Sequence, residues 1–226
     1  MDRRGAHRGG VCLNQYEMKR RSVIVILFIM GLLSLVEAPG SLFAQTGTPL
    51  GPAERQKVEA ELTQAAASMQ SLQCRFVQEK TSSMLAEPTL SEGLMRYVAP
   101  DQLRWEYTSP YAFALVVDGE RIVRETEGKS EVIEGNSGRM VQGIVNIIMG
   151  SASGKKLFDA SVFDVELYDE GDLWCAVMNP KRRDMKRMFS QMVFRFDKKT
   201  NQISRVEFKE LSGDTTVIRF EAMSRR

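Results

Sequence analysis

The pattern of apolar and polar residues changes period along the chain and predicts first a helix, then a series of strands. Between Pro52 and Met69 apolar side chains recur at helical spacing, with charged residues on the opposite side. This predicts an amphipathic helix of about 18 residues that begins at Pro52 and covers an apolar surface. Residues 47–52 are expected to form a flexible leader before it.

From Leu72 onward the period is two, which is typical of strands with one buried face. In the segment 103–107, for example, large apolar residues alternate with charged ones. Asp118-Gly119 between two apolar runs is a strong hairpin signal. The segments from 72 to 220 predict about ten strands joined mostly by hairpin-length turns, and hence an antiparallel sheet.

One segment, 138–150, interrupts the strands. It is almost entirely apolar, and its polar residues Gln142 and Asn146 lie four positions apart on one narrow side. A second helix that must be covered is therefore expected there, too short to span a bilayer. The combined pattern predicts a mainly β fold in which a strongly curved sheet has helices over its concave side.

The N-terminal segment predicts an extracytoplasmic location. A basic stretch, Met18–Arg21, precedes an apolar run over 22–36 and small residues that end at Ala44. This order is typical of a cleaved signal peptide, and a single anchor helix is the alternative. We expect a signal peptide over 1–44, with Met18 as the true start, and one domain over 45–226.

Charge and reactive residues narrow the function. Residues 1–44 carry six of the 31 basic and three of the 29 acidic side chains, so the rest is nearly neutral and no nucleic-acid partner is expected. The only histidine, His7, precedes the expected cleavage point, which argues against Ser-His-Asp catalysis and histidine-containing zinc sites. Cys74 and Cys175 are interpreted as small buried hydrophobes, with one disulfide between them as the alternative.

Several motifs between residues 71 and 119 resemble the LolA family of outer-membrane lipoprotein carriers. Ser71–Lys80 is similar to the family's F-x-Q-x-K strand. Ser91–Tyr97, Pro100, the run Leu103–Tyr107 and Pro110 resemble its G-x-hydrophobic-x-aromatic…P…RWEY…P pattern. The resemblance extends more generally over 52–222.

This resemblance implies an incomplete, half-open antiparallel β-barrel of about ten strands closed by a helical lid. It also implies a periplasmic, monomeric carrier that is not an enzyme, has no cofactor or metal, and takes acylated lipoproteins from an inner-membrane ABC transporter to an outer-membrane acceptor. One departure is Ala99, where some members have a basic residue before the proline. Arg104 is kept, and we interpret it as a structural or lid-latch charge rather than a catalytic group.

Candidate lipid-binding residues are chosen on the lid and on the sheet. On the lid side they are Leu62, Met69, Met140, Ile144, Ile147 and Ile148. On the sheet they are Phe76, Leu94, Trp105, Phe113, Leu115 and Trp174. Ordinary core packing is the alternative for each of them, because the sequence does not fix which face of the sheet is concave.

Other interpretations remain open at this stage. A lipid-sensing module that binds a regulatory membrane protein, or a carrier of another acylated lipid, fits the same half-barrel. An enzyme is disfavoured by the missing histidine. The basic segment 181–187 is interpreted as a solvated loop, with an anionic membrane or partner surface as the alternative.

Overall fold

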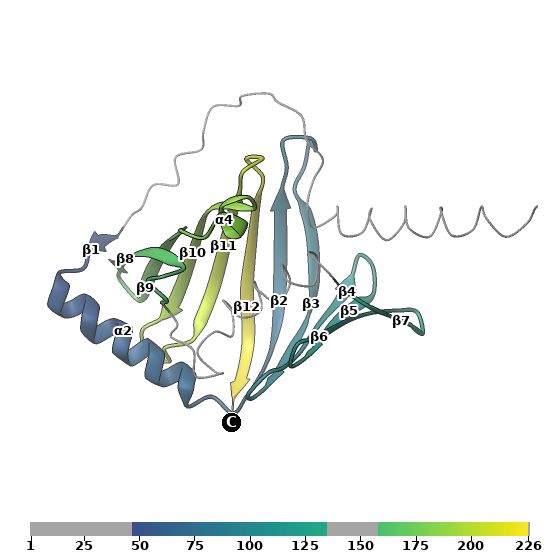
Figure 1. Ribbon diagram of the computed structural model, residues 1–226, viewed down its shortest axis with the longest axis horizontal. Helices are drawn as coiled ribbons and strands as arrows, with labels where there is room; N and C mark the ends of the chain where they lie inside the picture. Colours follow the sequence, from purple (N-terminus) through teal and green to yellow (C-terminus); the bar gives the residue numbers. More distant parts are fainter. Residues whose placement is uncertain (1–46, 135–157, 226) are drawn as a thin grey trace, which may run out of the picture. The chain divides into compact units, whose positions relative to one another are not determined.

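The computed structural model describes residues 47–134 and 158–225. Within these ranges twelve strands accompany one long helix and one short one (Figure 1). The elements are β1 (Thr48–Pro49), α2 (Pro52–Ala67), β2 (Ser71–Thr81), β3 (Thr89–Val98), β4 (Gln102–Ser109), β5 (Phe113–Asp118), β6 (Arg121–Thr126), β7 (Lys129–Val132), β8 (Phe163–Glu170), β9 (Leu173–Pro180), α4 (Arg183–Lys186), β10 (Phe189–Asp197), β11 (Ile203–Glu210) and β12 (Thr215–Arg225).

All twelve strands belong to one antiparallel sheet, in the order β1-β8-β9-β10-β11-β12-β2-β3-β4-β5-β6-β7. Among the described strands, β1 and β7 each have a neighbour on one side only, so the sheet is open rather than closed into a barrel (Figure 1). The predicted fold class, a half-open antiparallel barrel with a helical cover, is confirmed.

The edge strand β1 corrects the expected flexible leader. Thr48 and Pro49 pair with Asp169 and Tyr168 of β8. The Leu50 amide then donates to the Leu167 carbonyl at 2.9 Å. The leader is therefore fixed on the sheet, because β8 would otherwise leave a row of backbone groups unpaired.

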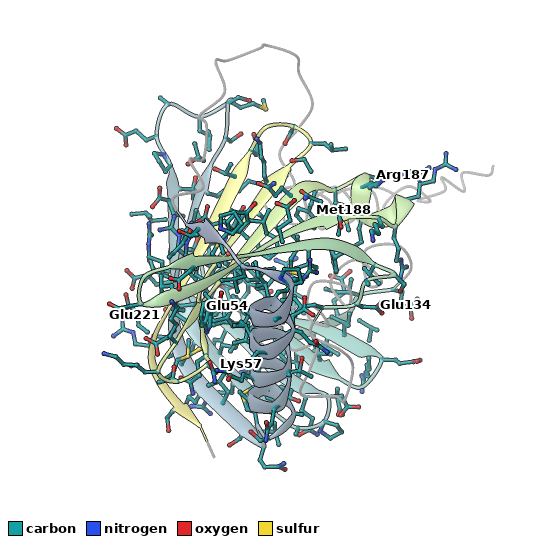
Figure 2. The ribbon with its side chains drawn as sticks, turned by 90° about the vertical axis from the view of Figure 1, so that its left-hand side faces the viewer. Glu54, Lys57, Glu134, Arg187, Met188 and Glu221 are labelled. Atoms are coloured by element: carbon teal, nitrogen blue, oxygen red, sulfur yellow. The ribbon has the colours of Figure 1, made fainter. Side chains whose placement is uncertain are left out.

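Helix α2 packs on one face of the sheet. Pro52 occupies its first turn, where the missing amide costs no helical hydrogen bond. Val58 and Leu62 are 2 % and 1 % exposed and belong to the same buried cluster as the sheet's aromatic residues. Figure 2 views α2 against the strands, with the exposed Glu54 and Lys57 labelled on it.

We call the sheet face that contacts α2 the inner face and the opposite one the outer face. Side chains alternate between the two faces except at the register shifts of β3, β10 and β12, so Phe76, Phe194 and Trp105 point inward while their chain neighbours point outward. The second predicted helix, 138–150, lies outside the described residues. No helix in 47–134 or 158–225 has the length and apolar character needed to cross a membrane.

The basic connection between β9 and β10 is more ordered than the expected solvated loop. Residues Arg183–Lys186 form the single-turn helix α4. Met185 is 5 % exposed and joins the inner-face core, while its basic neighbours Lys181, Arg182 and Arg187 are exposed. The apolar side chain in the middle of the run therefore anchors the basic residues to the sheet.

Candidate functional site

An aromatic cluster occupies the middle of the inner face. The Phe76 ring lies 4.5 Å from Trp105 and 5.2 Å from Tyr107. Trp105 meets Phe220 edge-on at 6.0 Å, and Tyr107 stacks on Phe113 at 4.5 Å. These rings come from β2, β4, β5 and β12, so the cluster spans the centre of the sheet and forms a continuous apolar surface on its inner face.

The apolar side chains of the inner face are not all buried to the same extent. Ala176, Met192 and Val206, on β9, β10 and β11, are completely buried. On β5, by contrast, Phe113 and Leu115 are only half-buried, although both pack against the same cluster. The inner face therefore keeps partly uncovered apolar surface on β5.

Seven of the predicted lipid-binding residues lie in the buried core of the inner face or pack against it. They are Leu62, Met69, Phe76, Trp105, Phe113, Leu115 and Trp174. The Trp174 ring is capped by a cation, since Lys198 Nζ stands 3.8 Å from its centroid. Lipid binding by these residues stays a prediction. Met140, Ile144, Ile147 and Ile148 lie outside the described residues.

The placement of Leu94 on the inner face is wrong. Leu94 pairs with Arg75 and Glu106, which are outer-face positions, whereas Met95 is 2 % exposed within the inner cluster. The strand has period two, so an assignment shifted by one residue exchanges the faces. Met95, next in sequence, is the inner-face residue of this pair.

Arg104 has a structural role within the described residues, and its lid-latch role stays a prediction because the predicted lid 138–150 lies outside them. Arg104 is on the outer face, away from α2. Its guanidinium donates to Glu106 at 3.0 Å and to Glu125 at 2.7 Å. These hydrogen bonds raise the Arg104 pKa, and the group serves as an outer-face ion-pair centre.

The alternative of a disulfide between Cys74 and Cys175 is excluded. Both are free, buried thiols. Cys74 faces inward from β2, whereas Cys175 packs with Tyr168 and Val177 on the outer face of β9. Four strand spacings of about 4.8 Å separate the two strands, far beyond the reach of a disulfide.

Two buried nitrogen donors lie on the inner face, one on the predicted residue Trp105 and one on Arg124, which is not among the predicted residues. Trp105 Nε1 and Arg124 Nε are buried and have no hydrogen-bond partner among the described residues. The Trp105 indole is near enough to the Tyr107 hydroxyl to oppose the rise of its pKa, but it does not reach hydrogen-bonding geometry. The sequence does hold a signal that places Arg124 on the inner face. Arg124 lies two residues after Ile122 on the same strand, so the two side chains point to the same side of the sheet, and Ile122 is buried there.

The outer face carries a separate, polar hollow of about 560 Å³ over β8 to β12. Its arginines are neutralised by adjacent carboxylates. Arg195 donates to Glu170 at 2.7 Å and also pairs with Glu207, which lies 2.9 Å from Arg205. Because each arginine here lies beside at least one carboxylate, the hollow is a structural ion-pair network rather than the leading candidate site, although Arg205 Nε makes no hydrogen bond within the described residues.

Metal-ligating side chains are not clustered in the described part of the chain. No group of three or more His, Cys, Asp or Glu residues there is arranged to hold an ion. The candidate site is therefore the apolar inner face with its two unpartnered donors.

The fold and site together define a class of half-barrel proteins whose open antiparallel sheet presents an apolar face beneath a helix. Residues 67–226 match the family model described as outer membrane lipoprotein carrier protein LolA. The chain belongs to the LolA family.

The solved structures that the chain matches are distant in sequence. A LolA superfamily protein, NE2245 from Nitrosomonas europaea, is 10% identical over 76% of this chain and 93% of its own, with a TM-score of 0.41. A putative outer membrane lipoprotein-sorting protein domain from Vibrio parahaemolyticus is 9% identical over 77% and 93%, with a TM-score of 0.42. The Pseudomonas aeruginosa MucA/MucB complex is 15% identical over 76% and 57%, with a TM-score of 0.43. A search of curated proteins finds no match.

Proposed function

We propose that this protein is a periplasmic carrier that binds the acyl chains of lipoproteins on its inner face and shuttles them from the inner to the outer membrane. Membership of the LolA family supports the carrier role. The proposed donor is an inner-membrane ABC transporter and the proposed acceptor lies in the outer membrane. The role requires binding and release, with no covalent step.

The observation that carries the proposal is the half-buried apolar surface of β5. Phe113 and Leu115 pack against the inner cluster but keep part of their surface uncovered. Exposed apolar surface on the inside of an open sheet is costly unless a ligand covers it. A flexible hydrocarbon chain suits such a surface, because it needs no directional partners.

The energetics favour partial burial of the cargo. Each buried methylene contributes about 0.8 kcal/mol, so three chains with about 40 methylenes would contribute about 30 kcal/mol if fully enclosed. Noncovalent affinities saturate at about 18–21 kcal/mol. A carrier must also release its cargo. An open sheet that covers only part of the acyl chains would keep the cargo soluble and still allow its release to the acceptor.

The direct test is mass spectrometry of the lipids and lipoproteins that co-purify with the protein from the periplasm. Acylated lipoproteins are expected in the purified fraction. Recovery of the protein with no acyl lipid or lipoprotein, under conditions that preserve complexes of a known carrier, would contradict the proposal.

A matched pair of variants on β5 localises the site. Leu115 and Val116 are neighbours, both half-buried, and they face inward and outward respectively. Leu115→Glu should lower the affinity for a fluorescent fatty-acyl probe by about tenfold or more, because the carboxylate must be desolvated against the chain. Val116→Glu should leave the affinity unchanged.

Circular dichroism and urea unfolding establish that each variant is folded. If Leu115→Glu fails to fold, Leu115→Trp tests the same position by filling the uncovered space. Wild-type affinity in a folded inner-face variant would show that acyl chains bind elsewhere.

A further inference from the structure

Three inner-face residues on successive strands form one row across the sheet. Trp105 of β4 pairs with Leu115 of β5, and Leu115 pairs with Arg124 of β6. Adjacent strands lie about 4.8 Å apart, so the backbones at Trp105 and Arg124 are about 10 Å apart, with the Leu115 side chain between them. The row therefore places two nitrogen donors around an apolar side chain.

Neither donor makes a full hydrogen bond in the described part of the chain, although the Tyr107 hydroxyl lies near the Trp105 indole. Trp105 Nε1 and Arg124 Nε are buried and make no hydrogen bond within the described residues. A buried donor without a partner costs about 1–3 kcal/mol, and native structures seldom leave one unless a ligand or solvent completes it. Two such donors in one row point to a ligand that brings oxygen acceptors.

Arg124 differs in its surroundings from the paired arginines of the sheet. Arg104 and Arg195 are each held by two carboxylates. The Arg124 guanidinium instead lies over the Phe113 ring, with Cζ 5.6 Å from the centroid. Its cross-strand partner Glu131 is exposed, and the two form no ion pair in the described structure.

The remaining charged neighbours do not neutralise Arg124 either. Glu125 faces outward and pairs with Arg104. Lys129 of β7 is opposite Thr126 and is itself a cation. A planar guanidinium suits the paired oxygens of a carboxylate or phosphate. The Phe113 ring keeps it in place by a cation–π contact without using its donors.

We propose that Arg124 and Trp105 bind the anionic oxygens of an acyl-lipid headgroup whose hydrocarbon chain lies on Leu115 and Phe113. This inference rests on the proposed function, since it requires an acyl chain on the inner face. It adds a preference that the apolar surface alone does not supply: carboxylate or phosphate headgroups bind more tightly than neutral or cationic ones.

The test is a series of amphiphiles with ten carbons in the chain, titrated calorimetrically below their critical micelle concentrations at pH 8. Decanoate and decyl phosphate should bind about tenfold or more tightly than decanol and decyltrimethylammonium. Inorganic phosphate should show no measurable binding, because it lacks the chain. Equal binding of all four amphiphiles would overturn the inference, as would binding of inorganic phosphate as tight as that of decyl phosphate.

Variants of β6 separate the headgroup site from general binding. Arg124→Met should abolish the preference for anions and change decanol affinity by less than about twofold, because it keeps an apolar stem of similar length. Arg124→Lys should retain part of the preference. Arg121→Met is the matched control, since Arg121 is exposed on the outer face of the same strand and should have no effect.

Trp105→Phe removes the second donor while keeping an aromatic ring. It should weaken decyl phosphate binding more than decanol binding. An Arg124→Met protein that is folded and still prefers anions would overturn the inference. If it does not fold, the wild-type headgroup series and Arg124→Lys still decide.

The two proposals fail in different ways. If wild-type protein binds none of the four amphiphiles, both the carrier proposal and the headgroup site fail. If it binds all four with similar affinity, acyl-chain binding stands and only the headgroup site fails.

Discussion

The Phe76 ring lies directly over Gly93 on the neighbouring strand. A Cβ added to Gly93 would stand 2.5 Å from Phe76 Cζ and closer still to the Glu106 carbonyl oxygen. Phe76 and Gly93 are register partners, and the β3–β4 pairing shifts at Glu92 and Gly93. The missing side chain therefore makes room both for the central ring of the inner cluster and for the close approach of β4.

Gly93→Ala should destabilise the protein by about 2–4 kcal/mol, because the backbone contact with Glu106 cannot be relieved by a side-chain rotation. Urea unfolding measures the change. Gly51→Ala is the control, since a Cβ added there would meet nothing within 4 Å and only the N-cap residue of α2 changes, so it should shift stability by less than about 1 kcal/mol. A Gly93→Ala protein as stable as the wild type would mean that β3 and β4 do not approach each other this closely.

Tyr107→Phe should cost about 1–2 kcal/mol of stability. The Tyr107 hydroxyl donates to Gln78 Oε1 at 2.9 Å, and its loss leaves the amide oxygen of Gln78 without that donor. Tyr111→Phe, at a residue that is 73% exposed, should have no measurable effect. Thermal unfolding of both variants beside the wild type checks the difference.

The same tyrosine should make the protein sensitive to alkali. Burial raises the pKa of Tyr107 to about 12 from an ordinary value near 10. Because the folded state favours the neutral phenol, the stabilising contribution is fully present below pH 10. It is lost as pH rises from about 10 towards about 12. The wild type should therefore lose more stability across this range than Tyr107→Phe, and parallel denaturation curves at each pH would contradict the assignment.

Removing Arg195 should be strongly destabilising. Its side chain is 20% exposed and compensates Glu170 and Glu207, each 10% exposed. Arg195→Met leaves both carboxylates without this partner, at a cost of about 3–5 kcal/mol. Urea unfolding measures the loss, and adding Glu170→Gln and Glu207→Gln to the Met variant should recover part of it.

The control for that prediction is an exposed pair. Arg75 and Glu92 are 3.8 Å apart with side chains 62% and 52% exposed. Arg75→Met should change stability by less than about 1 kcal/mol. Equal effects at Arg75 and Arg195 would show that burial does not set the energy of these ion pairs.

The two cysteines should be inert in the native state. Burial raises the pKa of each thiol to about 12, and Glu170 adds to the rise at Cys175. At pH 8 almost no thiolate is present, so iodoacetamide should modify Cys74 and Cys175 only after unfolding. Peptide mapping after alkylation locates the modified sites. Rapid native labelling, or a disulfide-linked peptide joining the two, would contradict their buried positions on opposite faces of the sheet.

The local pattern predicts most of the secondary structure because hydrophobic period is a local property. The helix from Pro52 and the strand signals of 103–107 and 117–124 depend on neighbouring residues alone. The alternation also predicts the correct parity within β4, where Leu103, Trp105 and Tyr107 are all buried. The inward-facing residues are harder to predict where a strand has apolar residues on both faces. In β3 Leu94 and Met95 are adjacent, and we predict Leu94 although Met95 is the one that points inward.

The same limit explains Arg104 and Arg124. A charged residue on a strand is ordinarily assigned to solvent, so the RWEY motif draws attention to Arg104, while the only local signal for Arg124 is that it shares the strand face of Ile122. Register places Arg104 between two carboxylates on the outer face and Arg124 over Phe113 on the inner face. Arg104 and Arg124 are the same residue type, and they differ in role because they lie on opposite faces of the sheet.

The order of residues along the chain is enough to predict the antiparallel half-barrel, its covering helix from Pro52 and the LolA family, because period, turns and motifs are encoded locally. Which residues face inward and which of them meet follows only from the folded sheet. Cross-strand register joins Trp105, Leu115 and Arg124 from three different segments of the chain, and strand order separates Cys74 from Cys175 by four strand spacings. Those relationships depend on strand order and pairing, which a residue's own neighbours in the chain do not specify.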